Sequence, residues 1–170
     1  MKGKKIAILI EELYQELEVW YPLYRLREAG ATVVTVGTGK PEYKSKLGYP
    51  CKADADVREL NGADFDAVVI PGGFAPDFMR RHDAVPKFVA DAHRAGAVIA
   101  AICHGVWICA SADILRGKRA TCFFAIRDDV KNAGAEYVDV EVCVDGNLVT
   151  SRMPDDLPAF MRETMRLIGG

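Results

Sequence analysis

The sequence has few histidines, and its cysteines form no recognised metal or redox motif. Among 170 residues there are three histidines, His82, His93 and His104, and five cysteines. No two cysteines have the Cys-x-x-Cys spacing of a zinc ligand pair or a thioredoxin-type dithiol. The two earlier histidines are expected in polar surface segments, and none follows His104. A metal site is therefore disfavoured. We predict neither a metal nor a cofactor.

The chain also lacks a strong excess of either charge and a secretory signal. Its 22 Lys and Arg residues face 24 Asp and Glu residues, which leaves no basic surface for nucleic acid or for an anionic membrane. The apolar run at residues 6–10 is too short for a signal peptide. Residues 95–112 carry no formal charge and reach the lower length limit of a transmembrane helix, but a buried strand, a turn and a buried helix explain them better. We expect a cytoplasmic protein with reduced thiols and neither a nucleic-acid nor a membrane partner.

The length suits one domain over residues 1–170. Continuous apolar runs alternate with helical patterns, which predicts an α/β fold with a mostly parallel sheet and helices on both faces. Strands are expected at residues 5–10, 32–36, 65–70 and 97–102, helices at 17–29, 83–95, 106–115, 126–133 and 158–168, and hairpins within 38–56 and 137–151.

In such a fold ligands bind beyond the carboxyl ends of the strands. Cys103 follows a buried strand with only His104 and Gly105 before the next helix, so it would stand on a sharp strand-to-helix turn. A helix N-terminus directed at the sulfur favours the thiolate. We therefore predict that Cys103 is a reactive nucleophile, whereas the other four cysteines are expected to be small buried apolar residues.

Other groups at the same sheet edge could support a thiol. His104 is the only histidine there, and a Cys–His pair is a standard route to an activated thiolate. Glu18 begins a helix at this edge, where a buried carboxyl group would have a raised pKa and could move a proton. The turn at Gly72 and Gly73 could present backbone N–H groups to an oxyanion.

These segments together resemble the PfpI family of intracellular cysteine peptidases, whose wider superfamily includes deglycases, glyoxalase-type enzymes, stress chaperones and class I glutamine amidotransferases. The resemblance runs nearly end to end. It rests on residues 101–105 (AICHG), 71–77 (PGGFAPD), 115–121 (LRGKRAT), 126–130 (IRDDV) and 151–157 (SRMPDDL).

The resemblance implies a flavodoxin-like three-layer sandwich in which Cys103 is the nucleophile. Glu18 matches the family glutamate that hydrogen-bonds the thiol, and His104 matches the histidine after the cysteine. In hexameric members an acidic residue of a neighbouring subunit completes a Cys-His-acid triad. Its position falls on Asp77, whose side chain is one carbon shorter than that of the usual glutamate. Gly72, Gly73 and the His104 amide match the oxyanion-binding region. A homo-oligomer, either a dimer or a hexamer, is therefore expected.

The sequence departs from the family pattern beside the predicted site. Ser-Tyr-Pro is common after the threonine that matches Thr121, but here Cys122, Phe123 and Phe124 follow it. Phe123, expected against the substrate, lacks the phenol that could donate a hydrogen bond. Cys122 adds a second thiol near the predicted pocket. This departure leaves the substrate open.

The leading hypothesis is a cysteine hydrolase that acts on peptides, on methylglyoxal or on methylglyoxal adducts of proteins. An oxidative-stress sensor or holdase chaperone is the alternative, because a low-pKa cysteine is easily oxidised. A glutamine amidotransferase would need a histidine far downstream of the cysteine, and none exists. A response regulator would need an aspartate where Pro71-Gly72-Gly73 stands, and the glutamates after the first strand would repel the phosphate of a flavodoxin cofactor.

Overall fold

The computed structural model describes residues 1–169, which build a seven-stranded sheet between two layers of helices. The strand order is β10-β11-β7-β6-β1-β2-β5, and every neighbouring pair is parallel except β10 with β11. The predicted mostly parallel α/β sheet is therefore confirmed. The strands are β1 (Lys5–Leu9), β2 (Thr32–Gly37), β5 (Ala55–Asp56), β6 (Ala67–Ile70), β7 (Val98–Ile102), β10 (Val142–Asp145) and β11 (Leu148–Ser151).

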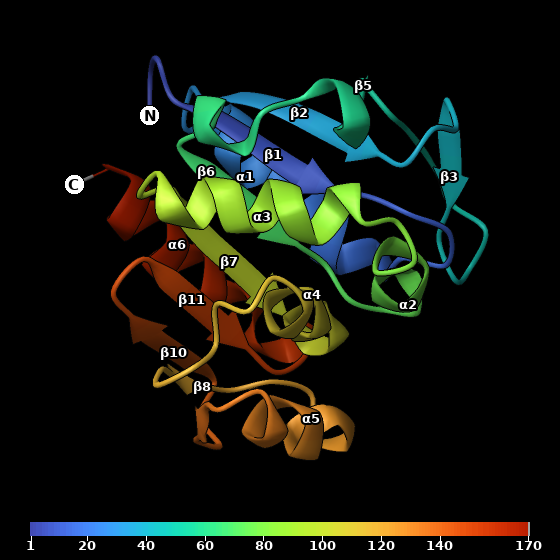
Figure 1. The fold of residues 1–170 in the computed structure, drawn as a ribbon. Helices are drawn as coiled ribbons and strands as arrows, with labels where there is room; N and C mark the ends of the chain where they lie inside the picture. The colour runs from blue at the N-terminus through green and yellow to red at the C-terminus, as the bar shows by residue number, and fades with distance from the viewer. Residues whose placement is uncertain (170) are drawn as a thin grey trace.

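Helices cover both faces of this sheet. On one face α3 (Ala84–Arg94) and α4 (Val106–Ser111) pack against β6 and β7, with α2 (Ala75–Met79) beside α4. On the other face α1 (Glu16–Glu28) contacts β2, and α6 (Leu157–Gly169) contacts β7 and β11. Figure 1 shows α3 in front of the sheet and α1 and α6 behind it. Every residue of β6 and β7 is buried, as expected for strands covered on two sides.

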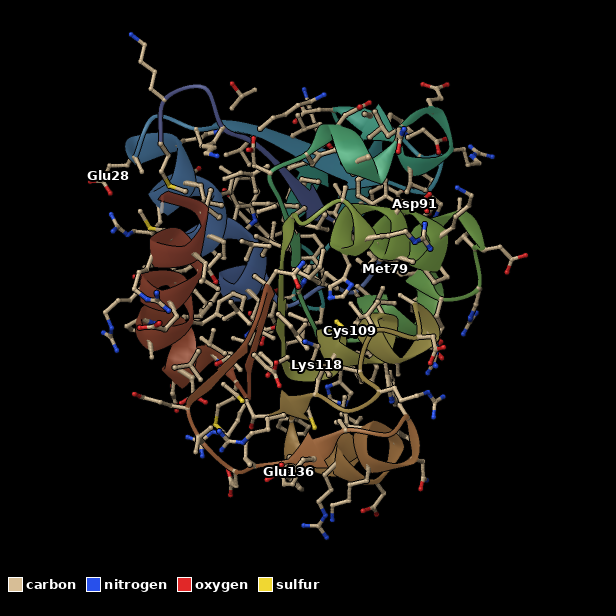
Figure 2. The ribbon with its side chains drawn as sticks, turned by 60° about the vertical axis from the view of Figure 1, so that its left-hand side comes forward. Glu28, Met79, Asp91, Cys109, Lys118 and Glu136 are labelled. Atoms are coloured by element: carbon tan, nitrogen blue, oxygen red, sulfur yellow. The ribbon has the colours of Figure 1, made fainter. Side chains whose placement is uncertain are left out.

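Side chains fill the space between the layers. Cys109 and Met79 lie inside the body, while Glu28 and Glu136 project at its rim (Figure 2). All five cysteines are free and buried. The four that were expected to act as small apolar residues are thus in the predicted environment.

Two expected elements differ from the structure. The helix predicted at residues 106–115 ends at Ser111, because Asp113 takes a left-handed φ of 52° that no α-helix can continue. The first strand of the hairpin predicted within residues 137–151 is split. β9 (Glu136–Tyr137) pairs with β8 (Arg119–Ala120) in a separate small sheet, whereas β10 joins the main one. The segment changes partners, and its residues 138–141 belong to neither strand.

The remaining elements are short. β3 (Glu42–Lys44) and β4 (Pro50–Lys52) form the predicted hairpin, and α5 (Arg127–Asn132) lies beside β9. In residues 1–169, no helix has both the length and the apolar composition that crossing a membrane requires.

The two ends of the sheet have different surroundings. β1, β6 and β7 point their carboxyl ends toward the loops that hold Glu11, Pro71 and Cys103. At the opposite end, a hollow of about 350 Å³ is lined by the start of β1, the start of β7 and the end of α6. Figure 1 marks both chain termini at that side of the molecule.

Candidate active site

Cys103 stands on a strained turn at the end of β7. Its φ of 61° lies in the left-handed region, which residues other than glycine rarely adopt. The 3₁₀ turn Cys103–Gly105 then leads directly into α4. Gly105 is needed here because a Cβ at this position would lie 2.3 Å from the carbonyl oxygen of Ile70. The predicted strand–turn–helix elbow is present, and backbone strain of this kind is common at functional sites.

Glu18 reaches the same place from the first turn of α1. Its side chain is fully buried, and Oε2 accepts a 2.6 Å hydrogen bond from the Gly72 N–H. Gly72 lies between the two groups, since a Cβ there would be 2.8 Å from both Oε2 and the Cys103 Cβ. Burial raises the pKa of Glu18 to about 8, against the opposing effects of the Gly72 amide and Lys46. The carboxyl group is therefore mostly protonated at neutral pH.

The burial of the Cys103 sulfur favours the protonated thiol over the thiolate. Burial, together with the nearby Glu18 charge, raises the pKa of Cys103 to about 12, although the backbone N–H groups of His104 and Gly73 act in the opposite direction. Burial therefore opposes the thiolate that the sequence favours, and the turn and the short helix act against this effect. A base must take the proton before the sulfur can attack.

The His104 imidazole is in position to be that base. Its Nδ1 lies 3.3 Å from the Cys103 Sγ, because the left-handed turn at Cys103 brings two adjacent side chains together. Burial and the Lys46 charge lower the pKa of His104, which keeps the ring neutral. The ring stacks on Phe123 at 4.9 Å and meets the edge of Trp107 at 5.2 Å. Two aromatic residues therefore fix its orientation.

The residues predicted to bind an oxyanion have two different roles. The N–H of Gly72 is occupied by Glu18, whereas the N–H groups of Gly73 and His104 are directed at the sulfur. Gly73 has a φ of 72°, and a Cβ there would lie 2.6 Å from the Leu13 carbonyl oxygen. Only glycine fits this turn.

Asp77 lies outside the site of a single chain. It sits on α2, forms an ion pair with Arg81, and exposes about half of its side chain. Cys122 is completely buried and does not line the cavity. His82 is exposed as expected, but His93 is half-buried, and its Nε2 has no hydrogen-bond partner in residues 1–169. The prediction of a solvated surface position for His93 was wrong, because helix packing covers that nitrogen.

The groups around Cys103 enclose a cavity of about 200 Å³. Sequence reasoning placed Glu18, Gly73, Cys103, His104 and Phe123 there. It missed four lining residues, which come from turns without a periodic pattern: Gln15, Lys46, Phe74 and Pro154. Gln15 alone had a local signal, because its side chain caps α1 by accepting hydrogen bonds from Leu17 N and Glu18 N.

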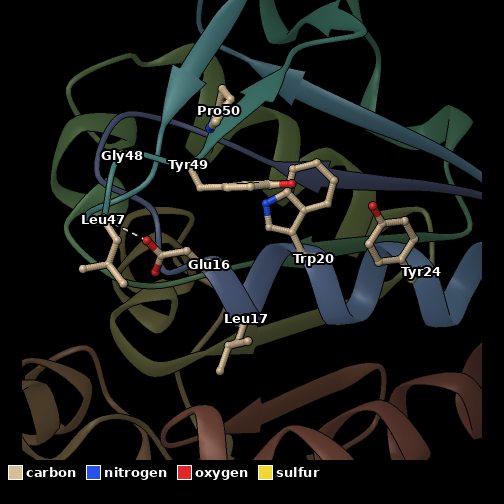
Figure 3. Close-up of a pocket in the computed structure, with 8 residues that line it drawn as sticks. All are labelled: Glu16, Leu17, Trp20, Tyr24, Leu47, Gly48, Tyr49 and Pro50. Carbon is tan, nitrogen blue, oxygen red and sulfur yellow. Dashed lines mark hydrogen bonds between the residues drawn. The ribbon is translucent and has the colours of Figure 1, made fainter.

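A larger groove of about 540 Å³ lies between α1 and the turn that joins β3 to β4 (Figure 3). Its floor holds Trp20, flanked by Tyr24 and by the edge-on ring of Tyr49. Leu17 is 55% exposed and Leu47 is 82% exposed. Neither hollow contains a metal cage, and residues 1–169 hold no group of three or more His, Cys, Asp or Glu side chains arranged to bind a metal ion.

Comparisons with known proteins give matches along nearly the whole chain. Residues 4–167 match the model of the DJ-1/PfpI family. The chain is 43% identical over 170 residues to Protein/nucleic acid deglycase 2 of Escherichia coli, covering 98% of this chain and 99% of that protein. It is 41% identical over 168 residues to the putative cysteine protease YraA of Bacillus subtilis, covering 98% and 99%.

A solved structure is similar as well. It is a two-domain protein of Anabaena variabilis with DJ-1/ThiJ/PfpI-like and ferritin-like domains, and it matches with a TM-score of 0.95 and 45% identity. The match covers 98% of this chain and 48% of that one. The flavodoxin-like architecture expected from the sequence is thus confirmed.

Proposed function

Because the chain belongs to the DJ-1/PfpI family, we propose that it is a cysteine-dependent hydrolase whose nucleophile is Cys103. One observation carries the proposal. Cys103, Glu18 and His104 line one small cavity, with two backbone N–H groups directed at the sulfur. The names of its relatives support two substrate classes, namely peptides and aldehyde adducts of the deglycase type.

The first step would be attack by sulfur on a carbonyl carbon. Nδ1 of His104 takes the thiol proton as the C–S bond forms, and the Gly73 and His104 N–H groups stabilise the negative charge on the carbonyl oxygen. With an aldehyde this gives a hemithioacetal once the oxygen is protonated. With a peptide the tetrahedral intermediate collapses to a thioester, and the released amine takes a proton.

Glu18 is suited to supply or accept a proton in the later step. It is protonated at neutral pH, and its Oε1 has no hydrogen-bond partner in residues 1–169. Water then attacks the thioester, the C–S bond breaks, and the acid and the free thiol form. A carboxyl group with a pKa near the working pH is effective in both directions of proton transfer.

The test compares methylglyoxal consumption and peptide cleavage side by side. We expect Cys103→Ala to lose both activities, since each needs the C–S bond. Cys122→Ala is the matched control, because Cys122 is buried and does not line the cavity. Wild-type activity in the Cys103→Ala variant would overturn the proposal, and the relative wild-type rates identify the substrate class.

A redox sensor or holdase chaperone remains the second candidate. The oxidation of a cysteine follows its thiolate character and its exposure. Cys103 is only 7% exposed, which limits the access of an oxidant and favours the enzyme. Rapid sulfinic acid formation at Cys103 under mild peroxide, with no turnover of either substrate, would favour the sensor.

We further propose a homo-oligomer, either a dimer or a hexamer, in which Asp77 of one copy approaches His104 of another. The half-exposed carboxylate of Asp77 and the exposed leucines of the groove support this arrangement. The cytoplasmic location stays a prediction. The absence of a nucleic-acid partner does too, since the name of the E. coli relative includes nucleic acid.

A further inference from the structure

Lys46 brings a positive charge to the wall of the active-site cavity. It lies in the turn between β3 and β4, and its backbone N–H donates to the Tyr14 carbonyl oxygen at 3.0 Å. This hydrogen bond ties the turn to the segment that precedes α1. The side chain lines the same cavity of about 200 Å³ as Cys103 and His104. The position of Lys46 relative to the nucleophile is therefore set by the hairpin.

The charge of Lys46 is not neutralised by an ion pair. No carboxylate of residues 1–169 lies within 4.0 Å of its ammonium group, whereas Lys40 on the same hairpin pairs with Glu12 at 3.0 Å. Glu16 on α1 is near enough for the Lys46 charge to lower its pKa, but its Oε1 accepts a 2.8 Å hydrogen bond from the Leu47 N–H and forms no salt bridge with Lys46. Lys46 therefore keeps an unpaired charge on the cavity side.

The other walls of the cavity offer a ligand little charge. Phe74, Phe123 and Pro154 are apolar, and Gln15 is neutral. The carboxyl group of Glu18 is buried behind Gly72 and is mostly protonated at neutral pH. Lys46 is exposed at the cavity wall, and a cation without a salt-bridge partner at such a wall attracts anions that enter the cavity.

We propose that Lys46 forms a carboxylate subsite, so that the preferred substrates of Cys103 are small organic acids with the carboxylate close to the reacting carbon. A cavity of this size is smaller than the pockets of about 300–1,000 Å³ that hold drug-sized ligands, which favours a ligand no larger than an amino acid. The inference depends on the proposed function in one respect: it takes the sulfur of Cys103 as the atom that reacts with the substrate.

Alkylation of Cys103 tests the subsite without any turnover. Iodoacetate and iodoacetamide both alkylate sulfur through a CH₂ carbon and release iodide, but only iodoacetate carries a carboxylate. Rate constants for both reagents are measured at Cys103 by peptide mass spectrometry, at one pH and low ionic strength. We expect Lys46→Gln to lower the ratio of the iodoacetate to the iodoacetamide rate constant about three- to tenfold. Added salt should lower the wild-type ratio.

Two variants control for the change in net charge. Lys44→Gln removes a lysine from the same hairpin, but Lys44 does not line the cavity, so its ratio should equal that of the wild type. Lys46→Arg keeps the charge and should keep most of the ratio. Equal ratios in wild type and Lys46→Gln would overturn the inference. So would an equal loss in Lys44→Gln, or a failure of Cys103 to react with iodoacetate.

The experiments distinguish a failure of the carboxylate subsite from a failure of the proposed hydrolase function. A Lys46-dependent ratio in a protein that turns over neither peptides nor methylglyoxal would uphold the subsite and reject the hydrolase. Turnover that depends on Cys103, with a ratio unaffected by Lys46→Gln, would uphold the hydrolase and reject the subsite.

Discussion

The buried carboxyl group of Glu18 makes the stability of the protein depend on pH. Its pKa is about 8 in the fold against 4.5 as the ordinary value, so the folded state prefers the protonated form. The stabilisation is complete below about pH 4.5 and is lost as the pH rises through about 8. Glu18→Gln removes this dependence because the amide stays neutral.

We therefore expect the unfolding free energy of the wild type, relative to Glu18→Gln, to fall by a few kcal/mol between pH 5 and pH 9. Urea denaturation at a series of pH values measures it. Glu16→Gln is the control, because hydrogen bonds lower the pKa of Glu16 and reverse the sign of its contribution. A pH-independent difference between wild type and Glu18→Gln would contradict the assignment.

The stacking of Phe123 on His104 predicts a kinetic effect. Aromatic pairs contribute about 0.5–1.5 kcal/mol beyond burial, so Phe123→Leu should lower kcat/KM roughly two- to tenfold by loosening the imidazole. Phe123→Tyr keeps the ring and should retain most of the activity. Tyr24→Leu, at an exposed aromatic position outside the cavity, serves as the control. A larger loss in Tyr24→Leu than in Phe123→Leu would count against this role.

At the scale of single residues, the sequence predicted positions better than protonation. The positions of Cys103 and Glu18 could be predicted because each lies in the first turn of an element at the carboxyl edge of the sheet. The contact between Cys103 and His104 could not, since it requires a positive φ that nothing in the sequence specifies. The sequence favours a thiolate, and burial, which raises the thiol pKa and opposes that form, is a property of the folded chain.

At the scale of elements, the elbow depends on the close packing of the turn against β6. A methyl group at Gly105 would meet the Ile70 carbonyl oxygen at 2.3 Å, and backbone cannot move aside as a side chain can. Gly105→Ala should therefore cost about 3 kcal/mol of unfolding free energy and should also reduce activity. Gly117→Ala should cost only about 1 kcal/mol, because its φ of 72° is strained but the space is open.

Thermal and urea unfolding, read together with the activity assay, test this pair. Equal stability losses in the two variants would mean that the elbow is free to shift away from β6. Full activity in Gly105→Ala would show that the position of Cys103 tolerates such a shift.

Most elements were predictable because buried parallel strands have a strong apolar signature. The four central strands and helices α3, α5 and α6 lie where the sequence placed them. The predictions were wrong where the structure depends on the backbone conformation of one residue or on which strand a segment pairs with. Asp113 ends α4 early, and Tyr137 pairs with β8 rather than with the neighbouring strand. Neither the early end of α4 nor this pairing can be predicted from the spacing of apolar residues.

At the scale of the whole molecule, the apolar groove predicts association between copies. The double variant Leu17→Glu/Leu47→Glu places charges on its rim and should shift an oligomer to monomers, measured by size-exclusion chromatography with light scattering. Phe124→Glu, which charges an exposed aromatic residue outside the groove, should leave the mass unchanged. A wild-type mass of 18.6 kDa would reject the oligomer, and with it the role of Asp77 between subunits.

The start of β1 and the end of α6 lie at the amino edge of the sheet, the edge opposite to Cys103. The position of the ends makes the fold a suitable module for tethering. A linker joined before β1 or after α6 would begin at the edge opposite to the cavity, so an attached domain, bead or surface would leave the entry route for diffusing substrate open. The Anabaena protein combines a similar domain with a ferritin-like domain.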